Sequence, residues 1–449
     1  MLTTLLLSRL QFAITISFHI LFPAFSIGLA TYLVITEGLW LKTRRRVYYQ
    51  TAKFWSKILA LTFGMGIVSG LAMQFQTGTN WAGFSAIVGP VLGVLFTLEV
   101  LTAFFIEATF LGVMLFGWHY VPRWLHYFAT VMVFIGVSVS ALWIMCANSW
   151  MQTPAGVIFQ HHQFIVTSWL HVIFNPSALV RYGHMMLAAY LATACVIMAV
   201  ACFYLLKYRY RRFARLNAQF AAVIIALIIP LQIILGDEVG YRMHEYQPIK
   251  TAAIEGLWHT QKAAPLVLFA VIDQAHQENH FVIKIPYLAS ILNTHQVHGR
   301  LEGLTTVSPK DQPDVMITFY SFRIMVGLGL LMLLSSWCAC YLLFRKRFWQ
   351  ARWLQKFFIF SAPIGFLALL TGWYTAETGR QPWVVYHYLK TYEGVSDISQ
   401  SRVMLGFIII LVVYGIIFGC GYLTYFFKTI NYGPIIKSRK RKQLSQLIQ

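Results

Sequence analysis

Nine apolar stretches, each about as long as a membrane-crossing helix, constrain the fold of this chain more than any other feature. Roughly 20 apolar residues in an α-helix span the hydrocarbon core of a bilayer. The stretches lie near residues 10–38, 53–73, 91–116, 124–147, 181–205, 217–236, 318–344, 355–376 and 403–427. With 58% hydrophobic and 11% charged residues, the composition lies outside the range of soluble globular domains. We therefore predict an all-α integral membrane protein, a bundle of about nine transmembrane helices.

Basic residues alternate between the connections, and this alternation predicts the orientation. Lys and Arg gather after the first, fifth and seventh stretches and in the C-terminal tail, at Arg44–Arg46, 207–215, 345–356 and 437–442. The connection from Gln74 to Pro90 carries neither residue type. Because cytoplasmic connections are enriched in Lys and Arg, we expect the N-terminus outside and the C-terminus in the cytoplasm. The net charge of +20 then reflects topology, and we do not expect nucleic-acid binding.

One connection is far longer than the others and divides the chain into three parts. Residues 237–316 contain nine acidic and six basic residues, a formal charge of −3. Long polar connections of this kind are usually functional or disordered. We predict transmembrane helices 1–6 in residues 1–236 and an extracytoplasmic domain in 237–316. Transmembrane helices 7–9 and a basic cytoplasmic tail then occupy 317–449.

Ionisable side chains lie inside or at the ends of the apolar stretches, where their cost indicates function. The segment GWYTAETGRQPW ends an apolar stretch with Glu377 and Arg380. His19, His184 and Met325 lie in other stretches, and the predicted orientation places them on the same outer side as Glu377. His, Met and carboxylate side chains ligate iron or relay protons. We therefore predict metal ligands among His19, His184, Met325 and Glu377.

The ligand types distinguish two kinds of haem site. A histidine and a methionine on opposite sides of a haem give a low-spin iron suited to electron transfer, whereas oxygen chemistry needs an open position. A single ligand such as His19 or Glu377 leaves that position open. Arg323 lies two residues before Met325 and is placed to pair with a haem propionate. A lone intramembrane histidine is about as often structural as functional, and the chain has 15 methionines. The six cysteines show no CxxCH spacing, which disfavours covalently attached haem.

Two carboxylates in the third stretch predict a proton path. Glu99 and Glu107 are eight residues apart, which is about 12 Å of rise and a net turn of about 80° in an α-helix. Both can therefore line one side of the helix and carry protons from the cytoplasm toward the outer side. The alternative is that the carboxylates are paired or protonated for packing alone. In the fourth stretch Ser140, Trp143 and Asn148 are candidate lining groups.

The long connection contains a further candidate pair and several histidines. In KTAAIE, Lys250 and Glu255 are five residues apart. A carboxylate base beside a cation suits the oxidation of a quinol, which loses two protons with its two electrons. A solvated charge pair is the alternative. The sequence HQENH displaces the glutamate of an HExxH metal motif, so a structural metal there is only the minor alternative.

Six segments carry a resemblance to a known family. They are SRLQFAITISFH, the stretch with Glu99 and Glu107, RYGHMM, GDEVGY with KTAAIE, SFRIMVG and GWYTAETGRQPW. Together they span essentially the whole chain, which resembles subunit I of the cytochrome bd-type quinol oxidases with a short quinol loop. The resemblance implies a multi-pass protein of the bacterial cytoplasmic membrane.

The resemblance also implies cofactors, roles and partners. His184 and Met325 would ligate a low-spin haem b. His19 and Glu377 would serve two high-spin haems, one a haem b and the other a haem d or a further haem b. Lys250 and Glu255 would take part in quinol oxidation, Glu99 and Glu107 in proton transfer, and Arg323 and Arg380 in supporting haem propionates or charge. A second membrane subunit and a small single-span subunit are implied as partners, with ubiquinol or menaquinol and O2 as substrates.

From these features we expect a terminal oxidase subunit that oxidises quinol outside, reduces O2 to water and takes the consumed protons from inside. One alternative is a proton-coupled transporter with Glu99, Glu107 and Glu377 as carrier groups. Such a transporter is typically built from inverted repeats, which the sequence does not show. Another alternative is a b-type haem protein that transfers electrons without oxygen chemistry.

Overall fold

The computed structural model describes residues 3–434, and most of these residues are helical. Within that range, nine helical segments are long and apolar enough to cross a membrane, as the sequence predicted. They are α1 (Thr4–His19) with α2 (Leu21–Thr43), α3 (Arg46–Thr79), α4 (Ala82–Glu99) with η1 (Val100–Phe104) and α5 (Phe105–Phe116), α6 (Arg123–Gln152), α8 (Ala178–Leu206), α9 (Arg211–Tyr246), α12 (Val315–Phe344), α13 (Arg352–Phe360) with α14 (Ile364–Thr378), and α15 (Gln400–Tyr414) with η6 (Gly415–Leu423) and α16 (Thr424–Tyr432).

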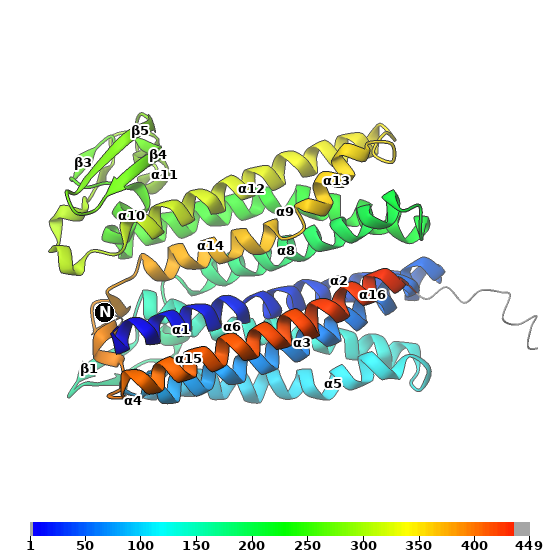
Figure 1. The fold of residues 1–449 in the computed structure, drawn as a ribbon, viewed down its shortest axis with the longest axis horizontal. Helices are drawn as coiled ribbons and strands as arrows, with labels where there is room; N and C mark the ends of the chain where they lie inside the picture. The colour runs from blue at the N-terminus through cyan, green and yellow to red at the C-terminus, as the bar shows by residue number, and fades with distance from the viewer. Residues whose placement is uncertain (1–2, 435–449) are drawn as a thin grey trace, which may run out of the picture.

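The helices lie nearly side by side in two groups (Figure 1). In one group α8, α9, α12 and α14 form a closed ring, because α8 packs on α9, α9 on α12, α12 on α14, and α14 on α8. In the other group α6 contacts α4, η1 and α5, while α1 packs on α3 and α15. Helix α2 joins the two groups through contacts with α3, α6 and α8. The ring and the second group meet at α2, α6 and α8.

The first spanning segment is broken at His19, and the sequence explains the break. Helix α1 ends at His19 and α2 begins at Leu21. Pro23 has no backbone N–H to bond the carbonyl of His19, and its ring crowds that carbonyl. The break therefore places a candidate ligand at a helix end, in the middle of a membrane-spanning segment.

The long connection forms a small domain, here called the loop domain, at the same end of the bundle as the N-terminus (Figure 1). It contains α10 (Pro248–Glu255), β3 (Gln261–Lys262), β4 (Leu266–Asp273), β5 (Glu278–Ile285), α11 (Leu288–Thr294), β6 (Arg300–Leu301), η3 (Leu304–Thr306) and η4 (Pro309–Asp311). Strand β4 pairs with β5 and β3 with β6, both antiparallel. A core that includes Trp258, Leu304 and Val315 ties the loop domain to the start of α12. These strands were not predicted from the sequence.

The loop domain begins later than the apolar pattern suggested. Helix α9 continues from residue 237 to Tyr246, so ten residues assigned to the connection are helical. Glu238 and Arg242 form an ion pair of 2.8 Å one turn apart on this extension. Such pairs stabilise exposed helix, which explains why the helix outlasts its apolar segment.

The remaining strands also lie in connections. They are β1 (Val157–Gln160) with β2 (Gln163–Val166), followed by α7 (Trp169–Ile173), and β7 (Trp383–Val385) with β8 (Leu389–Lys390), followed by η5 (Thr391–Gly394); η2 (Gly117–His119) follows α5. The basic connections at 44–46 and 345–352 lie at the opposite end from the loop domain (Figure 1). The predicted basic tail at 437–442 lies outside the described residues.

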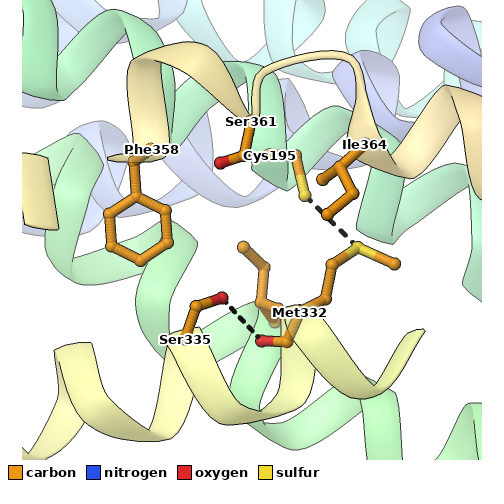
Figure 2. Close-up of a pocket in the computed structure, with 7 residues that line it drawn as sticks. Cys195, Met332, Ser335, Phe358, Ser361 and Ile364 are labelled. Carbon is orange, nitrogen blue, oxygen red and sulfur yellow. Dashed lines mark hydrogen bonds between the residues drawn. The ribbon is translucent and has the colours of Figure 1, made fainter. Parts of the chain in front are cut away.

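The ring is densely packed toward that opposite end. A cavity of about 10 Å³ is lined by Cys195, Met332, Ile364 and four neighbours, whose side chains are drawn in Figure 2. The thiol of Cys195 lies 3.6 Å from the sulfur of Met332. A space of this size holds about one water molecule at most. It is therefore too small to be a cofactor site.

Candidate functional site

His184 lies inside the ring and has a free ring nitrogen. Its Nε2 is 3.0 Å from the side-chain nitrogen of Gln232 on α9. Its Nδ1 is buried and has no hydrogen-bond partner. Gly236 on α9 faces the imidazole of His184, and a Cβ at Gly236 would lie 3.3 Å from His184 Cε1. Because buried polar atoms are rarely left without a partner, the unpartnered nitrogen suits a residue that awaits a ligand.

Met325 on α12 is fitted against a glycine in the same way. A Cβ at Gly372 on α14 would lie 2.8 Å from Met325 Sδ, which is closer than atoms pack without strain. Glycine at position 372 is therefore required for the observed position of the thioether sulfur.

His184 and Met325 lie on helices that are opposite each other in the ring, α8 and α12. They also lie at nearly the same level along the bundle axis. Helices α8 and α14 run in opposite directions (Figure 1) and touch where Gly365 packs on Ala192. From that contact, His184 lies eight residues along α8, about 12 Å, and Gly372 seven residues along α14, about 10.5 Å. Met325 lies at the level of Gly372. This arrangement fits a haem held between the two side chains, with an imidazole on one face and a thioether on the other.

His19 faces α3. Its Nδ1 is 3.0 Å from Ser69 Oγ, and a Cβ at Gly70 would lie 3.3 Å from its Cε1. Two residues earlier on α1, Ser17 Oγ lies 2.9 Å from the hydroxyl of Tyr374 on α14. Residues two apart on an α-helix point about 200° apart, so Ser17 faces α14 while His19 faces α3.

Glu377 is the centre of a buried polar network. Its two carboxylate oxygens accept hydrogen bonds from Arg380 at 2.5 Å, Asn148 at 2.9 Å and Gln152 at 3.2 Å. The Arg380 side chain is 5% exposed, yet its Nε and Nη1 are buried without partners. Unused guanidinium donors in a buried position suit a carboxylate such as a haem propionate. The residues around Glu377 therefore also fit a haem.

Arg181 and Lys250 complete this network. Arg181 donates to Asn148 at 2.5 Å, and Lys250 Nζ donates to Gln152 at 3.0 Å and to the carbonyl of Ala376 at 2.7 Å. Burial lowers the pKa of Lys250 well below its usual range, the Arg181 guanidinium lowers it further, and Glu377 opposes both effects. Sequence reasoning missed Arg181 and Gln152. The signal for Arg181 was present, because an arginine opens the apolar segment RYGHMM.

Glu255 points away from Lys250, so the two do not form the predicted adjacent pair. Five residues of helix α10 turn the two side chains about 140° apart. Glu255 is buried, accepts a hydrogen bond of 2.9 Å from Asn293, and has one oxygen without a partner. Burial raises the pKa of Glu255, while the Asn293 hydrogen bond and the Arg323 charge lower it. Its cationic neighbour is therefore Arg323.

Arg323 holds the loop domain against the ring. Its guanidinium donates to the carbonyls of Ile254 at 2.6 Å and of Val267 at 2.5 Å and 2.9 Å. It also lies over the ring of Phe319. A positive charge is thus fixed two residues from Met325 and next to Glu255.

Glu99 and Glu107 both lie against α6. Ser140 donates to Glu99 at 2.8 Å, and a Cβ at Gly136 would lie 2.5 Å from Glu107 Cγ. Gly136 and Ser140 are four residues apart and therefore on one face of α6. The intervening π-helix η1 is wound more loosely than an α-helix, which reduces the net turn between the carboxylates below the predicted 80° or so.

Helix α6 contacts the three carboxylates one after another along its length, and its contact residues turn by about 120° between Gly136 and Asn148. Gly136 packs on Glu107 and Ser140 bonds Glu99. Further along the helix, Asn148 and Gln152 both bond Glu377. Of the predicted lining groups, Ser140 bonds Glu99 and Asn148 bonds Glu377, while Trp143 bonds Thr102 at 2.8 Å. Glu107 is 7% exposed and has one oxygen without a partner.

The chain is similar to proteins of one family over its whole length. A family model described as cytochrome bd terminal oxidase subunit I matches residues 7–434. Cytochrome bd-II ubiquinol oxidase subunit 1 of Escherichia coli is 33% identical, covering 91% of this chain and 93% of its own. Cytochrome bd ubiquinol oxidase subunit 1 of Bacillus subtilis is 34% identical, with 96% and 94% covered. The solved structure of bd oxidase from Geobacillus thermodenitrificans superposes with a TM-score of 0.90 at 26% identity, covering 96% of this chain and 99% of that one.

Proposed function

The chain belongs to the cytochrome bd terminal oxidase subunit I family, the catalytic haem-bearing subunits of quinol:oxygen oxidoreductases, and on this basis we propose what its own residues do. Its nine apolar segments make it a multi-pass protein of the bacterial inner membrane. Family membership sets aside both the transporter and the electron-transfer protein without oxygen chemistry. Its residues must therefore divide among haem ligation, quinol oxidation and proton transfer.

His184 and Met325 hold a low-spin haem b inside the ring. The observation that carries this assignment is their position at opposite corners and nearly equal depth, each facing a glycine. A haem bound there supplies one-electron transfer at a potential raised by the thioether ligand. The side-chain nitrogen of Gln232 lies 3.0 Å from His184 Nε2 and fixes the orientation of the imidazole ring.

His19 and Glu377 serve two high-spin haems, one a haem b and the other a haem d or a further haem b. Each would provide a single ligand, and one of the two irons would keep a position open for O2. Arg380 balances the carboxylate of Glu377, and its unused donors would hold a haem propionate. Arg323 supplies a second fixed charge near Met325.

Quinol oxidation takes place at the loop domain, with Glu255 as proton acceptor. Its buried carboxyl and unpartnered oxygen suit a general base for a quinol hydroxyl. The buried Lys250 links α10 to α6 and α14. We therefore assign Lys250 the task of positioning Glu255 relative to the ring. The substrate is ubiquinol or menaquinol.

Glu107 and Glu99 carry protons along α6 toward Glu377. With the N-terminus and the loop domain outside, protons leave quinol outside, while those that form water arrive from the cytoplasm through Glu107 and then Glu99. Each charge moved across 100 mV stores about 2.3 kcal/mol. This separation of charge generates a proton motive force without a pump.

The complex contains a second membrane subunit and a small single-span subunit. Family membership is the ground for this proposal. Copurification from detergent-solubilised membranes tests it.

The visible spectrum of the purified complex tests the haem assignments. We expect b-type bands and CO binding in difference spectra, and a chlorin band in the red if haem d is present. The variant Met325→Leu should alter the low-spin band and leave CO binding in place. A preparation without haem, or a Met325→Leu spectrum identical to the parent, would contradict the assignment.

A further inference from the structure

The tip of the β4–β5 hairpin gathers four potential metal ligands on the surface of the loop domain. Asp273 ends β4 and pairs with Glu278, while His280 lies two residues further along β5. Residues two apart on a strand share a face, and a directly opposed pair shares a face as well. Asp273, Glu278 and His280 are therefore on one side of the hairpin. His276, in the turn, folds back onto Asp273.

The donor atoms are already close to the separations that a metal requires. Asp273 Oδ2 lies 2.8 Å from His276 Nδ1 and 3.8 Å from His280 Nε2. His280 Nε2 in turn lies 3.5 Å from Glu278 Oε1. The donor atoms of Asp273, Glu278 and His280 all lie within 4.8 Å of one another. Ligands about 2.0–2.2 Å from a tetrahedral ion are separated by similar distances. Small side-chain rotations would close this site.

We propose that Asp273, His276, Glu278 and His280 form a binding site for a divalent transition-metal cation of the Zn²⁺ class. Two imidazoles and two carboxylates are a ligand set that zinc accepts. The two carboxylates neutralise the charge of the ion. The side chains are between 29% and 75% exposed, so an ion from solution reaches them directly.

The same strand connects this site to the proposed quinol site. Asn279 lies between Glu278 and His280 and points to the other face of the hairpin. It accepts a hydrogen bond of 2.9 Å from Trp258 Nε1 and donates one of 2.7 Å to the carbonyl of Gly256. Gly256 directly follows Glu255. An ion that draws Glu278 and His280 toward Asp273 therefore acts on the backbone beside Glu255, and this step rests on the proposed function.

Titration of the intact, tag-free complex with ZnCl2, followed by competition with a fluorescent chelator, tests the site. We expect the double variant His276→Gln/His280→Gln to bind one equivalent fewer or at least tenfold more weakly. The variant Glu278→Gln should weaken binding as well, and an unchanged haem spectrum verifies assembly. His298→Gln, an exposed histidine elsewhere in the loop domain, is the matched control and should bind as the parent does. Equal stoichiometry and affinity in parent and double variant would overturn the site.

Quinol oxidation measured with and without ZnCl2 tests the connection. At a Zn²⁺ concentration that just saturates the parent, we expect turnover to fall at least twofold in the parent and in His298→Gln, and to fall less or not at all in the double variant. Zinc binding without any change in turnover would overturn the connection and leave the site standing. Failure of the proposed quinol site would appear separately, as unchanged turnover in Glu255→Gln without zinc.

Discussion

Replacing Gly372 by alanine should detach Met325 from its proposed haem iron. The new Cβ would lie 2.8 Å from Met325 Sδ, whereas such atoms normally pack about 3.5–4.0 Å apart. The sulfur must therefore move by about 1 Å. Metal–ligand distances tolerate about 0.2 Å, so the displacement exceeds what the bond accepts several-fold.

The Gly372→Ala substitution distinguishes loss of the ligand from loss of stability. It should weaken the bond from Met325 to the iron but stabilise helix α14. Alanine in place of glycine inside a helix stabilises that helix by about 0.5–1 kcal/mol. Any loss of the low-spin spectrum would then not come from a weakened α14. Gly327→Ala is the matched control: Gly327 lies two residues from Met325 on α12, and a Cβ there meets nothing within 4 Å.

The assay is a redox titration of the purified complex, monitored in the visible range. In Gly372→Ala we expect the low-spin b band to shift or fall, its midpoint potential to drop because the thioether is lost, and quinol oxidation to slow at least tenfold. CO binding should remain. A Gly372→Ala spectrum and potential equal to those of Gly327→Ala would refute the reasoning.

Two further predictions concern protons. Glu107→Gln and Glu99→Gln should each slow oxygen consumption at least tenfold. Quinol should still reduce the low-spin haem, because only proton delivery along α6 is interrupted. Unchanged oxygen consumption in an oxygen-electrode assay would rule out this path. Burial raises the pKa of Glu255, so its carboxyl keeps its proton to higher pH and quinol oxidation should rise as pH rises through that pKa. Asn293→Ala removes a hydrogen bond that favours the carboxylate, so the rise of quinol oxidation with pH should move to higher pH. Glu255→Gln should abolish this rise. A pH–rate profile identical in the parent and both variants would exclude Glu255 as the base.

The membrane architecture could be predicted from the sequence, and the sequence also named the residues that we propose as ligands. Membrane insertion depends on the apolarity of about 20 consecutive residues, so the nine segments are encoded locally. The cost of an ionisable group in such a segment singled out Glu99, Glu107 and Glu377 in the same way. Pro23, which breaks the helix at His19, is also a local signal.

Which of these residues contact one another depends on how the chain packs. Lys250 and Gln152 are 98 residues apart in the chain, and no local pattern relates them. The turn of helix α10 points Lys250 and Glu255 in different directions, so the cation near Glu255 is Arg323. The strands of the loop domain, which pair Asp273 with Glu278, depend on pairing between segments rather than on a membrane-length apolar run. Partners chosen by packing across the fold are therefore visible only once the chain is folded.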